Sequence, residues 1–458
     1  MKSKLSGNSS LKARGFGPAD YLKITILVFA MTALWQSMHM IILQYRVLDF
    51  VPEAEKNTYL YILISTGAIL AMIVQPIVGA ISDRSGFSWG RRRPFILVGV
   101  ILLLLLLPGI GLAGSFAVLF VIYCLMQISS NTAQGPHQGF IPDLVPEGKR
   151  GLASGVKGLL EILGMVALFY PISIFMDNYA AGEGSWWLWL ALAILGFLIL
   201  AVMVATVLMV KERPGTGGLR LPILPIIYRI FKIIIKELFN SLRSPTSRLL
   251  VFIQFIKTHR NFLWFLASRL LFFMAMAIIQ RSALYFLRDV IGVADPAESV
   301  FRFSILAIVG GLAVVYPAGR LSDRIGRKPI AVSSALLGAL GIIVIMLFQN
   351  ESSILIAAGI LGVAVGAFSS TNWALATDLV VKGKEARYLG LANMSTAGAS
   401  ALVVFIGPVI DHYEAVSAGL GYQAMLISCL VFFVLGGLLL LKVKGRVTPG
   451  SPAVPPSP

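Results

Sequence analysis

Long apolar segments, separated by short polar ones, run along almost the whole chain. Each apolar segment holds about 20 residues, the length that an α-helix needs to cross the hydrocarbon core of a bilayer. The pattern predicts twelve membrane-spanning helices in two groups of six. The first group is expected near residues 24–48, 59–81, 95–113, 116–141, 151–176 and 186–210. The second group is expected near residues 261–288, 300–321, 329–348, 353–379, 388–411 and 418–441.

The balance of residue types supports a membrane protein and excludes a soluble domain. Of the 458 residues, 57% are hydrophobic and 13% are charged. A soluble domain carries roughly 25% charged residues. The short segments of alternating polarity that build a membrane β-barrel are absent from the sequence. Cys124 and Cys429 both lie inside apolar segments, so a disulfide framework is not expected. We predict an all-α integral membrane protein.

Basic residues are distributed unevenly between the predicted loops. With the N-terminus placed in the cytoplasm, the inward loops are rich in Lys and Arg, and the outward loops carry mostly Asp and Glu. Because Lys and Arg favour the cytoplasmic side of a membrane protein, we expect both termini in the cytoplasm of a multi-pass plasma-membrane protein. The net charge of +17 then reflects membrane topology, and no nucleic-acid partner is expected.

The same pattern divides the chain into five segments. They are a cytoplasmic N-terminal segment at 1–23, a six-helix bundle at 24–210, a basic linker at 211–258, a second six-helix bundle at 259–442 and a tail at 443–458. In the linker, basic residues lie among Ile and Phe in "IIYRIFKIIIKELF", which predicts an amphipathic helix on the cytoplasmic membrane surface. The tail "RVTPGSPAVPPSP" has the composition of a disordered segment.

A charged loop after the second predicted span recurs in the second half of the chain. Residues 79–93 read "GAISDRSGFSWGRRR" and residues 319–328 read "GRLSDRIGRK", with five identical positions at an offset of 240. A second echo, at an offset of 235, relates "DLVPEGKR" from Asp143 to "DLVVKGKE" from Asp378. Several ordered matches, each at the same place in its six-span half, indicate an internal duplication.

Two six-helix halves with such loops resemble the major facilitator superfamily. The pattern G-x-x-x-D-R-x-G-R-R/K is similar to its signature loop between the second and third spans. The resemblance implies alternating access, with Asp83 and Asp323 holding the outward-facing state. The alternative is that the loop charges only anchor the topology. Contacts of these loops would form a cytoplasmic gate that closes the inner side of the transporter. The residues expected to act in this gate are Gly79, Asp83, Arg84, Gly86, Arg91, Arg92, Asp143, Arg150, Gly319, Asp323, Arg324, Gly326, Arg327 and Asp378.

Two blocks of sequence carry a narrower resemblance. The segments "VQPIVGAISDR…GRRRPFI" and "NTAQGPHQGFIPDL" resemble the plant sucrose–proton symporters and their animal relatives, in the glycoside–pentoside–hexuronide group. The blocks cover the second to fourth spans. The resemblance implies cation-coupled import of a glycoside such as sucrose.

Polar residues inside the predicted spans are candidates for a substrate site, because such residues are costly in a membrane and usually face a cavity or a partner. On the first span Thr25, Thr32, Gln36, His39 and Arg46 fall on one face at 100° per residue. Amides and hydroxyls suit a polyhydroxylated ligand, and Trp373 could stack on it. The alternative is that these groups only bond between helices. The candidates are Gln36, His39, Gln127, Asn131, Gln134, Gln280, Arg281, Asn372, Trp373 and Asn393.

Few charged residues in the spans could couple transport to a proton. Lys157 and Glu161 lie one turn apart on the fifth span, where a carboxylate prefers to be neutral or paired. The alternative is a static ion pair. His39 could carry the proton or contact the substrate. Arg269 is expected to snorkel towards the cytoplasm, and Arg281 could bind a carboxylate or pair with an outer acid.

These features predict a proton- or cation-coupled symporter for a sugar or glycoside, with no cofactor and no need for more than a monomer. A drug or metabolite exporter of the same fold is the first alternative. A non-transporting sensor is the second. An enzyme is not expected, since the sequence has no phosphate-binding glycine loop and no Cys/His cluster with metal-ligand spacing.

Overall fold

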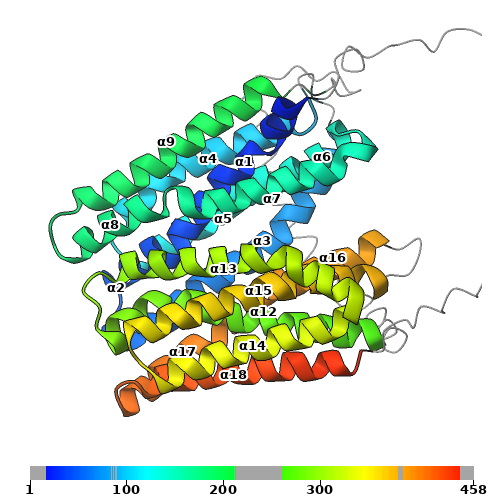
Figure 1. Ribbon diagram of the computed structural model, residues 1–458. Coiled ribbons are helices and arrows are strands. Elements are labelled where there is room, and N and C mark those ends of the chain that lie inside the picture. Colours follow the sequence, from blue (N-terminus) through cyan, green and yellow to red (C-terminus); the bar gives the residue numbers. More distant parts are fainter. Residues whose placement is uncertain are drawn as a thin grey trace, which may run out of the picture. The chain divides into compact units, whose positions relative to one another are not determined.

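The computed structural model describes residues 17–83, 85, 87, 90–210, 212, 260–379 and 385–443. The regular elements in these ranges are helices (Figure 1). Twelve of them are long and apolar enough to cross a membrane, which confirms the predicted number of spans. The predicted linker, apart from Glu212, and the predicted tail, apart from Val443, lie outside the described residues, as do Arg84 and Gly86 of the predicted gate.

The chain divides into two compact units. Unit 1 comprises Met1–Ser244 and Ala294–Phe301, and unit 2 comprises Pro245–Val293 and Arg302–Pro458. The helices of unit 1 are α1 (Pro18–Ser37), η1 (Met38–Ile42), α2 (Leu43–Leu48), η2 (Glu53–Glu55), α3 (Lys56–Asp83), α4 (Arg93–Leu112), α5 (Phe116–Gln138), α6 (Phe140–Leu144), η3 (Glu147–Lys149), α7 (Arg150–Ala167), α8 (Phe169–Ala180) and α9 (Trp186–Met209).

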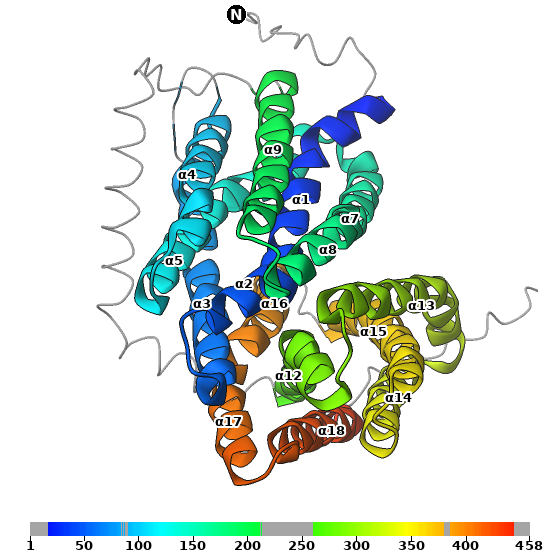
Figure 2. The same ribbon diagram turned by 90° about the vertical axis from the view of Figure 1, so that its left-hand side faces the viewer.

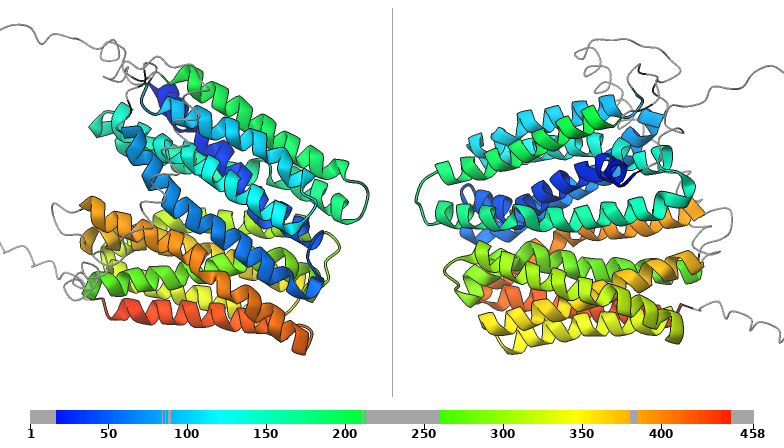
Figure 3. Two further views of the ribbon diagram at one scale, coloured as in Figure 1. Left: turned by 180° about the vertical axis from the view of Figure 1, so that it is seen from behind. Right: turned by 45° about the horizontal axis from the view of Figure 1, so that its top comes forward.

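Unit 2 repeats the plan of six spans. Its helices are α12 (Arg260–Phe286), η4 (Leu287–Ile291), α13 (Pro296–Ile325), α14 (Arg327–Leu347), α15 (Glu351–Leu379), α16 (Glu385–Leu402), η5 (Val403–Phe405), α17 (Ile406–Val416) and α18 (Leu420–Leu441). The first residues of α13 belong to unit 1 and the rest to unit 2. In unit 1 α4 packs between α5 and α9 (Figure 2), and in unit 2 α18 packs against α12 and α14 (Figure 3).

Local sequence explains where single spans are interrupted. The fifth span breaks between α7 and α8 at Leu168, three residues before Pro171. A proline has no N–H to donate and its ring collides with the carbonyl four residues earlier, which here is that of Ala167. The first span contains a π-helical turn, η1, at Met38–Ile42. The side chain of buried Gln44 donates to the carbonyls of His39 and Met40 in that turn, over 3.3 Å and 3.0 Å.

Glycines allow the same pair of helices to approach closely in both units. A Cβ added to Gly135 of α5 would lie 2.5 Å from the carbonyl oxygen of Gln75 on α3. A Cβ added to Gly366 of α15 would lie 2.3 Å from the carbonyl oxygen of Gly311 on α13. Contacts between membrane helices rely on small residues because lipid is as apolar as the side chains. These two positions therefore hold the second and fourth spans of each unit together.

Candidate functional site

A cluster of polar and aromatic side chains joins the first and fourth spans of unit 1. Its centre is the hydroxyl of Tyr123 on α5, 3.0 Å from Nε2 of His39 on η1. The amide of Gln127 donates to the same hydroxyl over 2.9 Å. The ring of Trp35 stacks on His39, with centroids 5.1 Å apart. We call these residues, with Ser130, Asn131 and Gln134, the His39 cluster.

The other members extend the His39 cluster along α5. The hydroxyl of Ser130 accepts hydrogen bonds from Trp35 Nε1 over 2.9 Å and from Gln134 Nε2 over 2.8 Å. Asn131 donates to the backbone carbonyl of Gln127 over 2.8 Å. These residues share a face because they lie three or four positions apart on one helix.

One part of the His39 cluster is buried, and the other part, which we call its edge, is partly exposed. Tyr123, Gln127, Ser130 and Asn131 are buried, while the side chains of Trp35, His39 and Gln134 are half-buried. The polar atoms at the edge belong to groups that can both donate and accept hydrogen bonds, beside an indole ring that offers an apolar face. This arrangement can bind a ligand with several hydroxyl groups. Gln36 lies apart from these contacts, with its amide 2.7 Å from the sulfur of Met40.

A lysine and a glutamate face each other on α7 of the same unit. Lys157 Nζ lies 2.9 Å from Glu161 Oε1, and the two side chains are 27% and 38% exposed. The predicted spacing of one helical turn therefore forms an ion pair that is partly accessible.

Sequence reasoning did not single out His137, on α5 near this pair. The side chain is 4% exposed, and its Nε2 has no hydrogen-bond partner among the described residues. The position of His137 inside the block "NTAQGPHQGFIPDL" was the signal that could have identified it.

In unit 2 a buried arginine lies where the first, fourth and fifth spans meet. Arg269 of α12 is 7% exposed. Its Nε donates to the carbonyl of Ala392 over 3.1 Å and to the hydroxyl of Thr396 over 3.0 Å, both on α16. Its Nη1 donates to the side-chain oxygen of Asn372 on α15. The expectation that Arg269 snorkels is therefore wrong, because its guanidinium turns inward to α15 and α16.

The remaining substrate-binding candidates of unit 2 are placed differently. Trp373 is 41% exposed, with its ring centroid 5.8 Å from the guanidinium carbon of Arg269. Arg281 is buried, and its Nη2 donates to the carbonyl of Ser400 over 2.6 Å. Gln280 and Asn393 are exposed. The structure thus gathers Asn372 and Trp373 around Arg269, and it does not bring Gln280 or Asn393 to that group.

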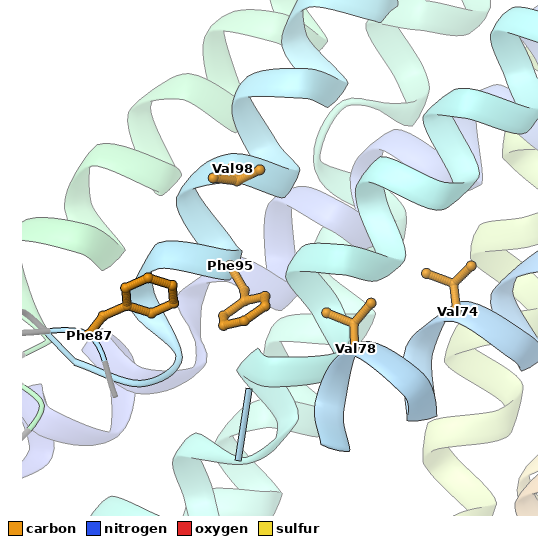
Figure 4. Close-up of a cluster of buried hydrophobic side chains, with 5 residues drawn as sticks. All are labelled: Val74, Val78, Phe87, Phe95 and Val98. Atoms are coloured by element: carbon orange, nitrogen blue, oxygen red, sulfur yellow. The ribbon is translucent and has the colours of Figure 1, made fainter. Parts of the chain in front are cut away.

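The charged loop of unit 1 forms a network around one guanidinium. Arg92 is 6% exposed and pairs with Asp83 over 2.8 Å and with Asp143 over 2.6 Å. Arg91 also pairs with Asp143 over 2.6 Å, and this hydrogen bond raises the pKa of Arg91 above its usual value. Arg150 donates to the carbonyl of Pro142 over 2.8 Å. An apolar cluster supports the loop, formed by Val74, Val78, Phe87, Phe95 and Val98 (Figure 4).

Glu212, which follows the last span of unit 1, caps the start of α4. Its carboxylate accepts hydrogen bonds from the backbone N–H groups of Arg92 and Arg93, at 3.0 Å and 2.9 Å. Gly90 permits this approach, because a Cβ there would lie 2.2 Å from Glu212 Oε2. Burial raises the pKa of Glu212, and the two backbone donors oppose that shift.

The loop of unit 2 forms a smaller network. Arg327 pairs with Asp378 over 2.6 Å, and Lys328 donates to the carbonyl of Leu441 over 2.6 Å. Gly326 has a φ of +98°, a value that favours glycine. Asp323 and Arg324 are exposed.

The first glycine of each loop motif lies at a close helix contact. A Cβ added to Gly79 would lie 3.9 Å from the carbonyl oxygen of Gly135 on α5. A Cβ added to Gly319 would lie 3.1 Å from the hydroxyl of Ser370 on α15. Both glycines therefore face the fourth span of their own unit.

Among the described residues, no group of three or more His, Cys, Asp or Glu side chains could hold a metal ion.

Comparison with known proteins identifies the fold and its relatives. The model of the Major Facilitator Superfamily matches residues 19–316 and 303–458. The chain is 29% identical over 189 residues to the sucrose transport protein SUT1 of Oryza sativa subsp. japonica, covering 34% of this chain and 35% of that protein. It is 33% identical over 119 residues to the multidrug resistance protein MdtL of Shewanella sp. (strain ANA-3), covering 26% and 29%. The chain thus spans about a third of the length of these relatives.

Solved structures support the same fold over nearly the whole chain. A bacterial homologue of the human lysosomal transporter Spinster matches with a TM-score of 0.68 at 15% identity, covering 93% of this chain and 97% of that chain. A D-xylose–proton symporter matches with a TM-score of 0.65 at 16% identity, covering 92% and 96%. At these identities the likeness concerns the fold alone.

Proposed function

Because the chain belongs to the major facilitator superfamily, we propose that it imports a sugar or glycoside together with a proton or another cation, by alternating access. The family and fold point to a transporter rather than an enzyme. The observation that carries the substrate class is the His39 cluster, in which polar groups that both donate and accept surround a half-buried indole ring. The resemblance of this chain to sucrose transport proteins supports the same class.

Coupling is assigned to the ion pair of α7. Glu161 lies 2.9 Å from the ammonium group of Lys157. Protonation of the carboxylate would remove that attraction and release the lysine. The net charge of the pair would then depend on whether Glu161 has taken up a proton from the side of the membrane to which it is open. His39 is a second acceptor for the proton, and it would link proton binding to the hydroxyl of Tyr123 that it contacts.

The loop network of Arg92 acts as part of the cytoplasmic gate in this proposal. A single guanidinium bound to Asp83 and Asp143 ties the end of α3 to the end of the fourth span. Opening of the inner side would require these pairs to rearrange. We also propose that both termini are cytoplasmic, that the protein lies in the plasma membrane and that the monomer is the transporting unit.

Uptake by purified protein in liposomes tests the proposal. With an inward proton gradient, radiolabelled sucrose or a related glycoside should accumulate, and a protonophore should abolish accumulation. Glu161→Gln should lose accumulation while it retains exchange of sugar across the membrane. Glu55→Gln, at an exposed position, is the matched control and should behave as the wild type. Full accumulation by Glu161→Gln would show that Glu161 does not couple transport to the proton gradient.

Export of a drug or metabolite is the second candidate function. The 33% identity to a multidrug resistance protein over 119 residues supports it. The same liposomes separate the two functions: an exporter would move a lipophilic dye against an opposing proton gradient, and sugars would not compete. Dye transport without any sugar transport would replace the first proposal with the second.

A further inference from the structure

Arg269 presents unused hydrogen-bond donors inside unit 2. A guanidinium carries five N–H groups. Its Nε is bonded to Ala392 and Thr396 and its Nη1 to Asn372. Among the described residues, no acceptor lies within hydrogen-bond distance of Nη2, and no carboxylate forms an ion pair with this arginine. A buried cation without a counterion is costly within a membrane span.

A second set of unused donors belongs to Asn372. This side chain is fully buried, and its Nδ2 has no hydrogen-bond partner among the described residues. Its Oδ1 is the atom that Arg269 binds, so the amide nitrogen lies on the same side-chain group as that contact. Buried polar groups are normally satisfied. Arg269 and Asn372 share one hydrogen bond, and each has N–H groups that lack an acceptor. Together they form a site suited to a ligand that accepts hydrogen bonds.

Aromatic rings restrict how a ligand could approach this site. The guanidinium carbon lies over the rings of Phe273, at 5.0 Å, and Trp373, at 5.8 Å, from their centroids. Such ring contacts leave the N–H groups of a guanidinium unused, and a carboxylate binds those groups in the plane of the guanidinium. Trp373 is 41% exposed, so one of the two rings beside the guanidinium lies partly at the surface of the protein.

We propose that Arg269 and Asn372 bind the carboxylate of an organic anion. The carboxylate accepts from Nη2 of Arg269 and Nδ2 of Asn372, and it neutralises the buried charge. Its placement in the substrate path rests on the proposed transport function, whereas binding itself can be measured without transport. A phosphate group shares the oxyanion chemistry, but a single arginine and a neutral amide match the single charge of a carboxylate better.

Thermal unfolding of the purified full-length protein in detergent tests binding. Gluconate and sorbitol differ in one terminal group, a carboxylate in place of a hydroxymethyl. Gluconate should raise the unfolding temperature in a saturable manner, sorbitol should not, and inorganic phosphate should act more weakly than gluconate. Equal effects of gluconate and sorbitol would overturn the proposal, and a stronger effect of phosphate would overturn the choice of carboxylate.

Asn372→Asp is the decisive variant, because it keeps Arg269 and places an internal carboxylate against it. The affinity for gluconate should fall about tenfold or more, since a charge-assisted hydrogen bond is lost and the cation is already neutralised. Asn350→Asp makes the same change at an exposed position 22 residues earlier in unit 2, and it should bind gluconate as the wild type does. Unchanged binding by Asn372→Asp would exclude the site.

Thermal unfolding in the presence of sucrose separates the proposed anion site from the proposed sugar transport. If sucrose stabilises Asn372→Asp as it does the wild type while gluconate no longer does, both proposals hold. A response to gluconate without any response to neutral sugars would support the anion site and contradict sugar transport. A response to sugars with no specific response to gluconate would do the reverse.

Discussion

The charged loops of the two units share one ion pair and differ in what surrounds it. Arg92 pairs with Asp143 in unit 1, and Arg327 pairs with Asp378 in unit 2, at 2.6 Å in each case. Both members of the second pair lie 235 positions after those of the first. In unit 1 the same guanidinium also binds Asp83, whereas the repeat counterpart Asp323 is exposed and forms no ion pair among the described residues.

The comparison separates a contact that both halves have from contacts of unit 1. The arginine–aspartate pair that joins the loop to the fourth span occurs in both halves. The further contacts of Asp83 and Glu212 concentrate on the loop of unit 1. We therefore expect changes in the unit 1 loop to have larger effects than equivalent changes in unit 2. Two of the four predictions that follow test this contrast, and the other two sharpen it.

The largest contrast is expected between Arg92→Ala and Arg327→Ala. Arg92 is 6% exposed, and its loss removes the partner of Asp83 and one of the two arginines that bind Asp143, which should lower the free energy of unfolding by about 3 kcal/mol. The Arg327–Asp378 pair is more exposed, with side chains at 29% and 49%, so its loss should lower it by about 1 kcal/mol or less. Chemical denaturation of both variants in mixed micelles measures the difference. Equal losses would show that the further contacts of unit 1 contribute no stability.

The glycine contacts between the second and fourth spans should instead be equally important for stability in the two units. Gly135→Ala and Gly366→Ala each place a Cβ within 2.5 Å of a backbone oxygen, and backbone cannot move aside as a side chain can. Each substitution should lower the free energy of unfolding by about 1–3 kcal/mol. A matched control is Gly155→Ala, where an added Cβ meets nothing within 4 Å. A large difference between the first two would contradict equivalent packing of the second and fourth spans.

Glu212 should contribute stability that depends on pH. Glu212→Ala leaves the N–H groups of Arg92 and Arg93 without their acceptor, at a cost of about 1–2 kcal/mol. Because burial raises the pKa of Glu212, the folded protein binds the proton more tightly than the unfolded chain. The stability gained from that proton is present below the unfolded pKa and is lost as pH rises through the folded pKa.

Comparison with Glu212→Gln isolates this effect. The glutamine keeps an acceptor for the backbone and does not titrate, so the wild type should gain stability relative to it as pH falls from 7 towards 4. Thermal unfolding at a series of pH values provides the measurement. The opposite slope would mean that the backbone donors outweigh burial.

The smallest contrast is expected between Asp83→Asn and Asp323→Asn. The Asp83 side chain is 53% exposed, so its pair with Arg92 should contribute about 0.5–1 kcal/mol, and Asp323→Asn should be neutral. If Asp83 also holds a conformational state, Asp83→Asn should change the rate of sugar uptake more than it changes the unfolding temperature. Identical uptake by both variants would remove Asp83 from the gate.

Hydropathy and charge were enough to predict the spans, because the length of an apolar segment and the position of Lys and Arg are written directly in the sequence. The repeat likewise singled out the four residues of the two Arg–Asp pairs, but it did not say which arginine binds which aspartate. The aromatic members of the His39 cluster could not be predicted, since Trp35 and Tyr123 have the residue types of ordinary core positions. Arg269 was misjudged for a similar reason: its partner Asn372 is 103 residues away, and sequence alone does not say which face of α12 meets α15.

The π-turn at Met38–Ile42 rotates the side chains that follow it about the helix axis, relative to those that precede it. A π-turn holds one residue more than an α-turn, and one residue of an α-helix corresponds to 100° of rotation. A face drawn at a constant angle from Thr25 to Arg46 therefore does not continue across the turn. His39 reaches Tyr123 on α5, while Arg46 reaches the carbonyls of Ile110 and Ala113 at the end of α4. A relative that lacked one residue here would differ by that single residue in composition and span length, yet its outer half would present a different set of side chains to each neighbouring helix.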